Sequence, residues 1–137
     1  MSQAIEVTRN IEIVHKYVAT FNRGDIDAVC NLFAKDALIW GVAGWGTPEQ
    51  VRPFWQELTS AFQINLTIDA LVADGDTVVA RYTERGKSVQ PFRGLGPTNR
   101  SYELLAMEWF EIKNNLIQRR WGTRDSASQN RQLGFSG

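Results

Sequence analysis

One acidic residue, Glu108, interrupts the apolar stretch LLAMEWF, and the arginines Arg119 and Arg120 follow in RRWGTRD. In an apolar pocket, burial raises the pKa of a carboxyl group and a nearby arginine lowers it, so such a carboxylate can serve as a general acid or base. Glu108 with Arg120 on the adjacent strand is therefore a candidate catalytic pair. The alternative is a surface pair between Glu108 and Arg119. A bulge near the turn at Asn114 would exchange the two faces, so the sequence leaves both open.

Asp125 is a second candidate catalytic carboxylate, which could reach the mouth of a pocket from the end of the last strand. The pattern favours a structural role instead, in which its side chain forms hydrogen bonds at the strand end. The single histidine, His15, flanks an apolar helix face, and Cys30 occupies a helical core position. No cluster of metal-ligand side chains is visible in the sequence, so no metal site is expected.

Helical spacing dominates the first third of the chain. Apolar residues recur at three- and four-residue steps and predict a first helix (Ile11, Val14, Val18, Phe21) and a short second one (Ile26, Val29, Cys30, Phe33). Gly24 suits the left-handed end of the first helix and Asp25 can cap the second. A third helix is expected to open at Thr47, with Pro48 in its first turn and Gln50 completing a capping box. Pro53 should bend this helix or delay its start.

After residue 63 the apolar period changes to two, which predicts strands. Leu66, Ile68, Ala70 and Val72 alternate before a turn at Asp74-Gly75, and the Asn114-Asn115 turn separates two further strands. Residues 86–101 form a loop rich in glycine and proline. The order, helices and then antiparallel strands, predicts an α+β domain with a curved sheet wrapped over helices.

Composition restricts the function classes. The 137 residues favour one domain, residues 1–137, and the 15 basic and 15 acidic residues cancel, which is unlike a nucleic-acid or anionic-membrane binder. One cysteine permits no internal disulfide, and the N-terminal MSQAIEVTRN lacks the apolar run of a signal peptide. No stretch approaches the roughly 20 apolar residues of a membrane span. The sequence therefore predicts a soluble, cytoplasmic protein whose partners are small molecules or other protein surfaces.

Several stretches together resemble the SnoaL-like polyketide cyclases. These are NRGDIDAVCNLFAKDALI, FRGLGPTNRSYE, and NNLIQRRW followed by RQLGF, in the family's order and spacing. The resemblance covers roughly residues 10 to 135. It implies the nuclear transport factor 2-like (cystatin-like) fold, a cone of helices and a curved antiparallel sheet around one pocket, often as a homodimer. It also implies aldol-type ring closure without metal or cofactor.

The family's catalytic residues are not reproduced at the matching positions. Its acid-base aspartate falls at Gly122, its substrate-binding glutamine at Ala106, a polar residue of the third helix near Phe54, and a histidine at Glu108. Through the resemblance, Trp40 and Trp45, which bracket the GVAG segment, are expected to line the pocket entrance. Phe54, Ala106 and Gly122 are candidates for substrate binding, together with Tyr17 and Trp121.

Leu105, Met107 and Trp109 alternate with Ala106 and Glu108 along one strand. If the latter two face the pocket, the three large apolar residues face outward, where they could be buried against a second subunit. Three hypotheses for function remain. The first is an enzyme that moves a proton or opens a strained ring, the second a non-catalytic protein that binds an apolar aromatic ligand, and the third an interaction module.

Overall fold

The computed structural model describes residues 3–41 and 44–135, which form helices on a single curved sheet. The helices are α1 (Gln3–Asn22), α2 (Ile26–Cys30), α3 (Pro48–Phe62) and α4 (Ser126–Leu133). The strands are β1 (Phe33–Gly41), β2 (Gly44–Gly46), β3 (Asn65–Asp74), β4 (Thr77–Lys87), β5 (Ser101–Lys113) and β6 (Leu116–Arg124). No helix among these residues is long and apolar enough to cross a membrane.

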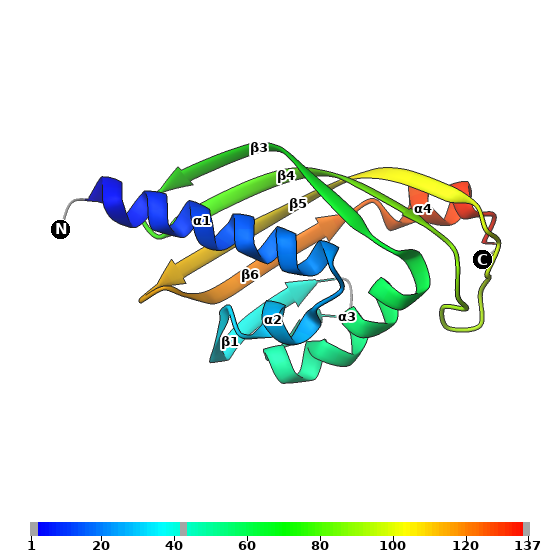
Figure 1. Ribbon diagram of the computed structural model, residues 1–137, viewed down its shortest axis with the longest axis horizontal. Helices are drawn as coiled ribbons and strands as arrows, with labels where there is room; N and C mark the ends of the chain where they lie inside the picture. The colour runs from blue at the N-terminus through cyan, green and yellow to red at the C-terminus, as the bar shows by residue number, and fades with distance from the viewer. Residues whose placement is uncertain (1–2, 42–43, 136–137) are drawn as a thin grey trace.

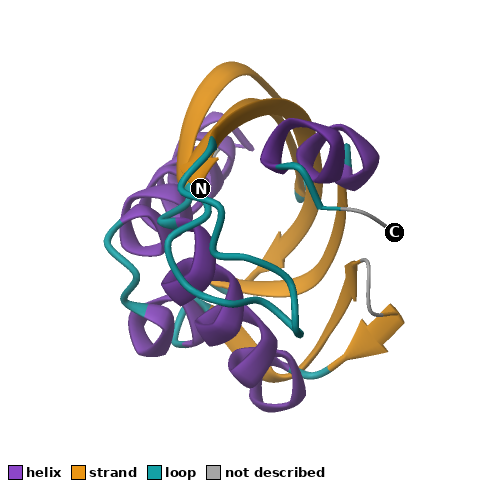
Figure 2. Ribbon diagram, turned by 90° about the vertical axis from the view of Figure 1, so that its right-hand side faces the viewer, coloured by secondary structure: helices purple, strands orange, loops and turns teal. Residues whose placement is uncertain are grey.

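The sheet curves around the helices, with strand order β2-β1-β6-β5-β4-β3. Figure 1 shows α1 lying along the sheet and α3 beside β1, and Figure 2 shows the curvature end-on, with α4 at one end of the cone. The expected α+β cone is thus confirmed. The expectation of an antiparallel sheet is wrong in one respect, because β1 pairs in parallel with β6. Since β1 is the first strand and β6 the last, sequence neighbours could not indicate this pairing.

Helix boundaries follow the expected capping residues. The Asp25 side chain accepts a hydrogen bond from the backbone N–H of Ala28 at 3.2 Å, at the start of α2. Thr47 and Gln50 form a reciprocal capping box at the start of α3. The third helix begins at Pro48, so Pro53 does not delay its start.

The phase of β3 differs from the expected alternation. A register shift between Ile68 and Ala70 exchanges the two faces of the strand. As a result Val72, expected inside, is 68% exposed, whereas Leu71 packs against the core. The hairpin turns lie where expected, with Gly75 at φ 57° and Asn114 and Asn115 also at positive φ.

The C-terminal segment forms a helix that the apolar periodicity did not predict. Asp125 caps α4 by accepting a hydrogen bond from the Ser128 N–H at 3.0 Å, and Gly134 ends the helix in the left-handed conformation. Leu133 is fully buried. Asp125 therefore has a structural role at the end of β6, which is the alternative that the sequence favoured.

Candidate active site

The sheet and the helices enclose a cavity of about 210 Å³. Its lining is mostly aromatic and aliphatic and comes from α1, α3 and all six strands. Charged side chains enter it at two places, one around Glu108 and one around Glu84. The cavity is thus a largely apolar space with two separate ionic clusters.

Alternation along β5 turns Glu108 inward. Leu104, Ala106 and Phe110 on the same face are buried, while Leu105 and Trp109 between them are 51% and 48% exposed. A register shift in the β5–β6 ladder then decides which arginine joins Glu108. It places Arg120, rather than Arg119, on the interior face. Both halves of the predicted pair therefore reach the cavity, and the surface alternative with Arg119 is not formed.

One carboxylate oxygen of Glu108 carries both its hydrogen bond and its ion pair. Its Oε2 accepts a hydrogen bond from the Tyr17 hydroxyl at 2.9 Å and lies 3.1 Å from Arg120 Nη1. The side chains of Glu108 and Arg120 are only 11% and 7% exposed. The Arg120 guanidinium also lies over the Trp55 ring, 5.7 Å from its centroid, where the ring quadrupole attracts a cation. These contacts fix the carboxylate in one orientation.

Three buried polar atoms around this pair have no hydrogen-bond partner among the described residues. They are Glu108 Oε1, Arg120 Nε and the Tyr82 hydroxyl. An unsatisfied buried polar group costs free energy and calls for a reason. All three belong to residues that line the cavity, so a bound molecule could supply their partners.

Both tyrosines beside Glu108 are held in their protonated form. Burial, and then the negative charge of Glu108, raises the pKa of Tyr17 and of Tyr82 well above the ordinary value. Each hydroxyl is therefore a neutral hydrogen-bond donor throughout the physiological range.

Gly122, where the sequence resemblance places an acid-base aspartate, faces the same cavity directly opposite Glu108. A Cβ atom built there would lie 1.7 Å from Arg120 Nη1 and 3.3 Å from Glu108 Oε2. The guanidinium of Arg120 therefore occupies the space that a side chain at residue 122 would need. A side chain at residue 122 would therefore displace the guanidinium from its present position beside Glu108.

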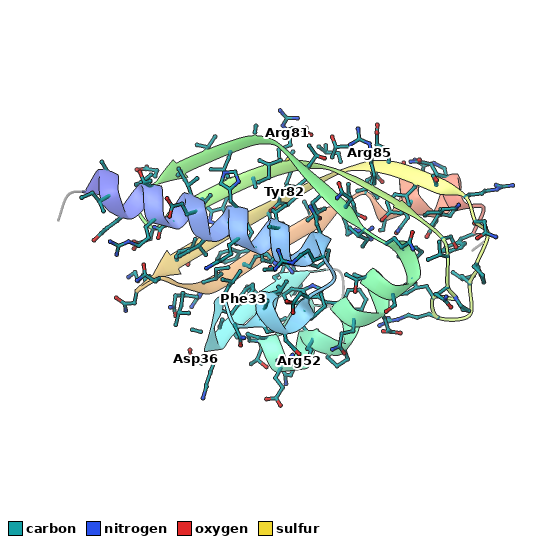
Figure 3. The ribbon with its side chains drawn as sticks, in the orientation of Figure 1. Phe33, Asp36, Arg52, Arg81, Tyr82 and Arg85 are labelled. Carbon is teal, nitrogen blue, oxygen red and sulfur yellow. The ribbon has the colours of Figure 1, made fainter. Side chains whose placement is uncertain are left out.

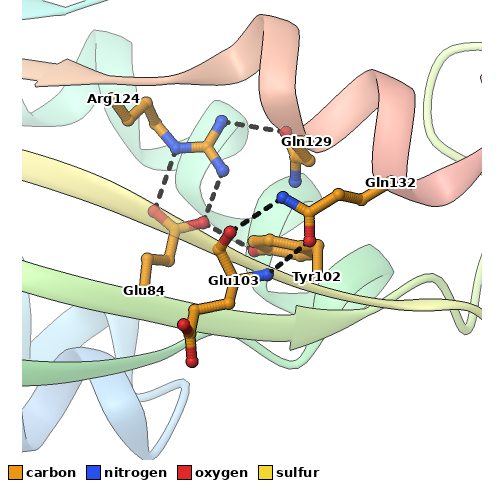
Figure 4. Close-up of polar contacts among 6 residues, drawn as sticks. All are labelled: Glu84, Tyr102, Glu103, Arg124, Gln129 and Gln132. Carbon is orange, nitrogen blue, oxygen red and sulfur yellow. Dashed lines mark hydrogen bonds and ion pairs between the residues drawn. The ribbon is translucent and has the colours of Figure 1, made fainter.

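The second ionic cluster joins Glu84 on β4 to Arg124 on β6 (Figure 4). Arg124 donates Nε to Glu84 Oε1 at 3.0 Å and Nη2 to Oε2 at 2.5 Å, a two-pronged contact. The Tyr102 hydroxyl donates to Glu84 at 2.5 Å and Gln129 accepts from Arg124 at 3.1 Å. Burial alone would lower the pKa of Arg124, but the hydrogen bonds and charge of Glu84 outweigh it and raise that pKa.

The sequence had not singled out Glu84 or Arg124. The available signal was the alternation Val78, Ala80, Tyr82, which places Glu84 on the same interior face one step further on. Both ends of the Glu84–Arg124 pair are satisfied within the protein, unlike those of the Glu108 cluster. This pair ties β4, β6 and α4 together.

The predicted binding residues divide into two groups. Tyr17, Trp45, Phe54, Ala106 and Gly122 line the cavity.

Trp40, Trp121 and Asp125 are not part of that lining. Trp40 and Trp121 alternate with the interior residues Ile39 and Arg120 and so belong to the outer face, where Trp45 contacts both rings. Val42 and Ala43, inside the predicted entrance segment, lie outside the described residues.

A cone-shaped α+β fold with one mainly apolar cavity defines a small-molecule pocket protein. Residues 14–120 match the model of the SnoaL-like domain, so the chain belongs to the SnoaL-like family of the nuclear transport factor 2-like fold. No curated protein matches the chain in the corresponding search.

Among solved structures, the chain is similar to IdmH of Streptomyces antibioticus, described as a candidate polyketide cyclase. They share 26% identity with a TM-score of 0.82, over 91% of this chain and 98% of IdmH. AclR of Streptomyces galilaeus, a candidate hydroxylase, has 17% identity and a TM-score of 0.86 over 96% and 99% of the two chains. An epoxide hydrolase of M. tuberculosis has 17% identity and a TM-score of 0.74 over 93% and 91%. One fold thus carries several chemistries, so the reaction must be argued from the site.

Proposed function

We propose that this protein is a cyclase- or isomerase-type enzyme that needs no cofactor and acts by acid-base catalysis on a hydrophobic, polyketide-like substrate. The proposal rests on the different environments of the two carboxylate oxygens of Glu108. Its Oε2 is held by Tyr17 and Arg120, while Oε1 has no partner. A fixed carboxylate with one unpartnered oxygen in an apolar cavity suits a general base.

In this proposal Glu108 Oε1 removes a proton from a carbon next to a substrate carbonyl group. Arg120 balances the charge of the carboxylate before the transfer, and the apolar walls exclude water from the reacting atoms. Returning the proton to another atom completes an isomerisation, and protonating a newly formed alkoxide completes an aldol closure. Asp125, which caps α4, takes no part in this scheme.

The test uses a defined carbon acid because the natural substrate is unidentified. β-Tetralone, an apolar bicyclic ketone, is incubated with the protein in deuterium oxide, and deuterium uptake at its carbon acids is followed by NMR. The wild-type protein should accelerate the uptake, and Glu108→Gln should abolish that acceleration. Glu103→Gln is the matched control, because Glu103 lies on the same strand but is exposed and pairs with Arg85 outside. Equal rates for wild type and Glu108→Gln would remove Glu108 from the mechanism.

A non-catalytic binding protein is the second candidate. It is favoured by Gly122 and Ala106, which stand where the family has its aspartate and glutamine, within an otherwise aromatic cavity. On this alternative the protein binds an apolar aromatic ligand and leaves it unchanged. Retention of such a ligand through purification, combined with no exchange on β-tetralone, would select it.

We also propose a homodimer formed through the outer face of the sheet. Leu105, Met107 and Trp109 are 51%, 39% and 48% exposed on that face. Trp40, at 41%, extends the same apolar surface across β1. Exposed apolar surface of this kind is typical of subunit interfaces. The cytoplasmic location remains a prediction from the sequence.

A further inference from the structure

Two buried tyrosines, one on α1 and one on β4, lie beside Glu108, and their hydroxyls differ in one respect. Tyr17 on α1 donates its hydrogen bond to Glu108 Oε2 at 2.9 Å. Tyr82 on β4 is fully buried, and its hydroxyl lies beside Glu108 without forming a hydrogen bond of normal geometry to any described residue. The first tyrosine is committed to holding the carboxylate, whereas the second has a donor available.

Strand register places Tyr82 next to Glu108. Tyr82 pairs with Ala106 across the β4–β5 ladder, and Ala80 pairs with Glu108, so Tyr82 and Glu108 are diagonal neighbours on the interior face. Tyr82 is buried, whereas Arg81 and Arg85 on the same strand are exposed, and both are labelled at the outer edge of the sheet in Figure 3. The small side chain of Ala106 leaves the space beside Tyr82 to the cavity.

We infer that Tyr82 is a further catalytic residue, whose hydroxyl donates a hydrogen bond to the substrate oxygen that becomes an enolate when Glu108 Oε1 takes the adjacent proton. This inference rests on the proposed function and assigns the substrate to the enolisable ketones. The C–H electron pair becomes the C=C bond of the enolate, the carbonyl π pair moves to oxygen, and the proton stays on Glu108 until another atom of the substrate takes it. A fixed donor aimed at developing oxygen charge is a strong catalytic contribution.

The chemistry of the two tyrosines makes them non-equivalent. A donor already bound to Glu108 Oε2 holds the base in position and cannot also serve the substrate. The Tyr82 hydroxyl can donate a hydrogen bond either to a molecule bound in the cavity or, after turning, to the Glu108 carboxylate. A Tyr82 hydroxyl that donated to Glu108 in solution would make Tyr82 a second positioning residue. Binding of an oxyanion distinguishes that role from donation to the substrate oxygen.

The first experiment measures binding of β-naphtholate, a stable aromatic stand-in for an enolate, to the Glu108→Gln protein. Glutamine imitates the neutral, protonated acid that faces the enolate after proton transfer. Adding Tyr82→Phe should weaken naphtholate binding about ten- to hundred-fold, the usual effect of losing a hydrogen bond to a charged group. Adding Tyr17→Phe instead removes one buried hydroxyl of the same kind and should weaken it less. Equal losses, no loss with Tyr82→Phe, or no naphtholate binding by Glu108→Gln would each overturn the inference.

The second experiment follows deuterium uptake by β-tetralone with Tyr82→Phe alone. Loss of an oxyanion donor should lower kcat/KM about hundred-fold, while urea unfolding confirms that the variant is folded. An unchanged kcat/KM with an inactive Glu108→Gln would overturn the role of Tyr82 and leave the proposed function standing. If the wild-type protein shows no uptake, the proposed function fails, and naphtholate binding still decides whether Tyr82 binds an oxyanion.

Discussion

Replacing Gly122 with alanine tests the central feature of the cavity, the position of Arg120. The added Cβ would lie 1.7 Å from Arg120 Nη1, far inside contact distance, so the guanidinium has to move. It is 7% exposed and paired with Glu108, and its departure would leave a buried carboxylate without its cation. A single methyl group should therefore dismantle the ion pair without touching either of its members.

The expected magnitude follows from two opposing terms. Alanine in a strand is more favourable than glycine by roughly 0.5–1 kcal/mol, because less backbone entropy is lost on folding. Breaking a buried ion pair by removing one partner costs about 3–5 kcal/mol. Gly122→Ala should therefore lower the free energy of unfolding by about 2–4 kcal/mol. Without the Arg120 clash, the same substitution would raise it.

Urea unfolding of four variants checks this reasoning. Gly41→Ala is the matched control, because Gly41 is also a strand residue and its Cβ would lie 3.9 Å from Arg120 Nη2, an ordinary contact. It should raise the free energy of unfolding by roughly 0.5–1 kcal/mol. In the Arg120→Ala background the obstacle is gone, so Gly122→Ala should become neutral or stabilising relative to Arg120→Ala alone. A destabilisation of the same size in both backgrounds would refute the assignment of the space above Gly122 to Arg120.

Three further predictions concern the rest of the molecule. Burial first, and then the charge of a neighbouring glutamate, raises the pKa of all 3 tyrosines, so stability should be full below about pH 10, where unfolded tyrosine ionises, and fall as the pH rises further. An absorbance titration should show tyrosinate only on unfolding, and stepwise ionisation of the folded protein near pH 10 would contradict this. Glu84→Gln should cost about 3–5 kcal/mol by stranding the charge of Arg124, against at most about 1 kcal/mol for the exposed Glu103→Gln; equal costs in urea unfolding would refute the importance of the buried pair. Met107→Glu should convert the proposed dimer to monomers in sedimentation experiments, whereas an unchanged mass would exclude this face as the interface.

The sequence predicted those parts of the fold that depend on local chemistry. Capping at Asp25 and Thr47 and the turn at Asn114-Asn115 came directly from residue types, and the structure has them in place. The phase of β3 and the choice of Arg120 over Arg119 did not, because each depends on a register shift that changes no residue type. A bulge exchanges the faces of a strand, which the alternation of apolar residues alone cannot reveal.

The candidate site was predicted in part for the same reason. Glu108 stood out because a charge within an apolar strand has few explanations, and its partner Arg120 followed from the adjacent strand. Glu84 could not be identified from the sequence because it ends an alternating run next to a charged stretch. A glutamate in that setting is ordinarily expected to be exposed to solvent. Tyr82 gave no signal of its own, since a tyrosine in a buried strand is usually a packing residue and only the geometry shows its hydroxyl to be unpartnered.

The parallel pairing of β1 with β6 has a consequence for how the protein forms. Ile39 and Arg120 are paired residues that both line the cavity, although they lie far apart in the sequence. During synthesis the helices and the β3–β4 hairpin can form early, but the cavity stays open on one side until β6 has left the ribosome. Closing such a long loop is entropically slow. Nascent chains would therefore expose the apolar lining of the cavity to chaperones, or to the ligand itself, before β6 pairs with β1.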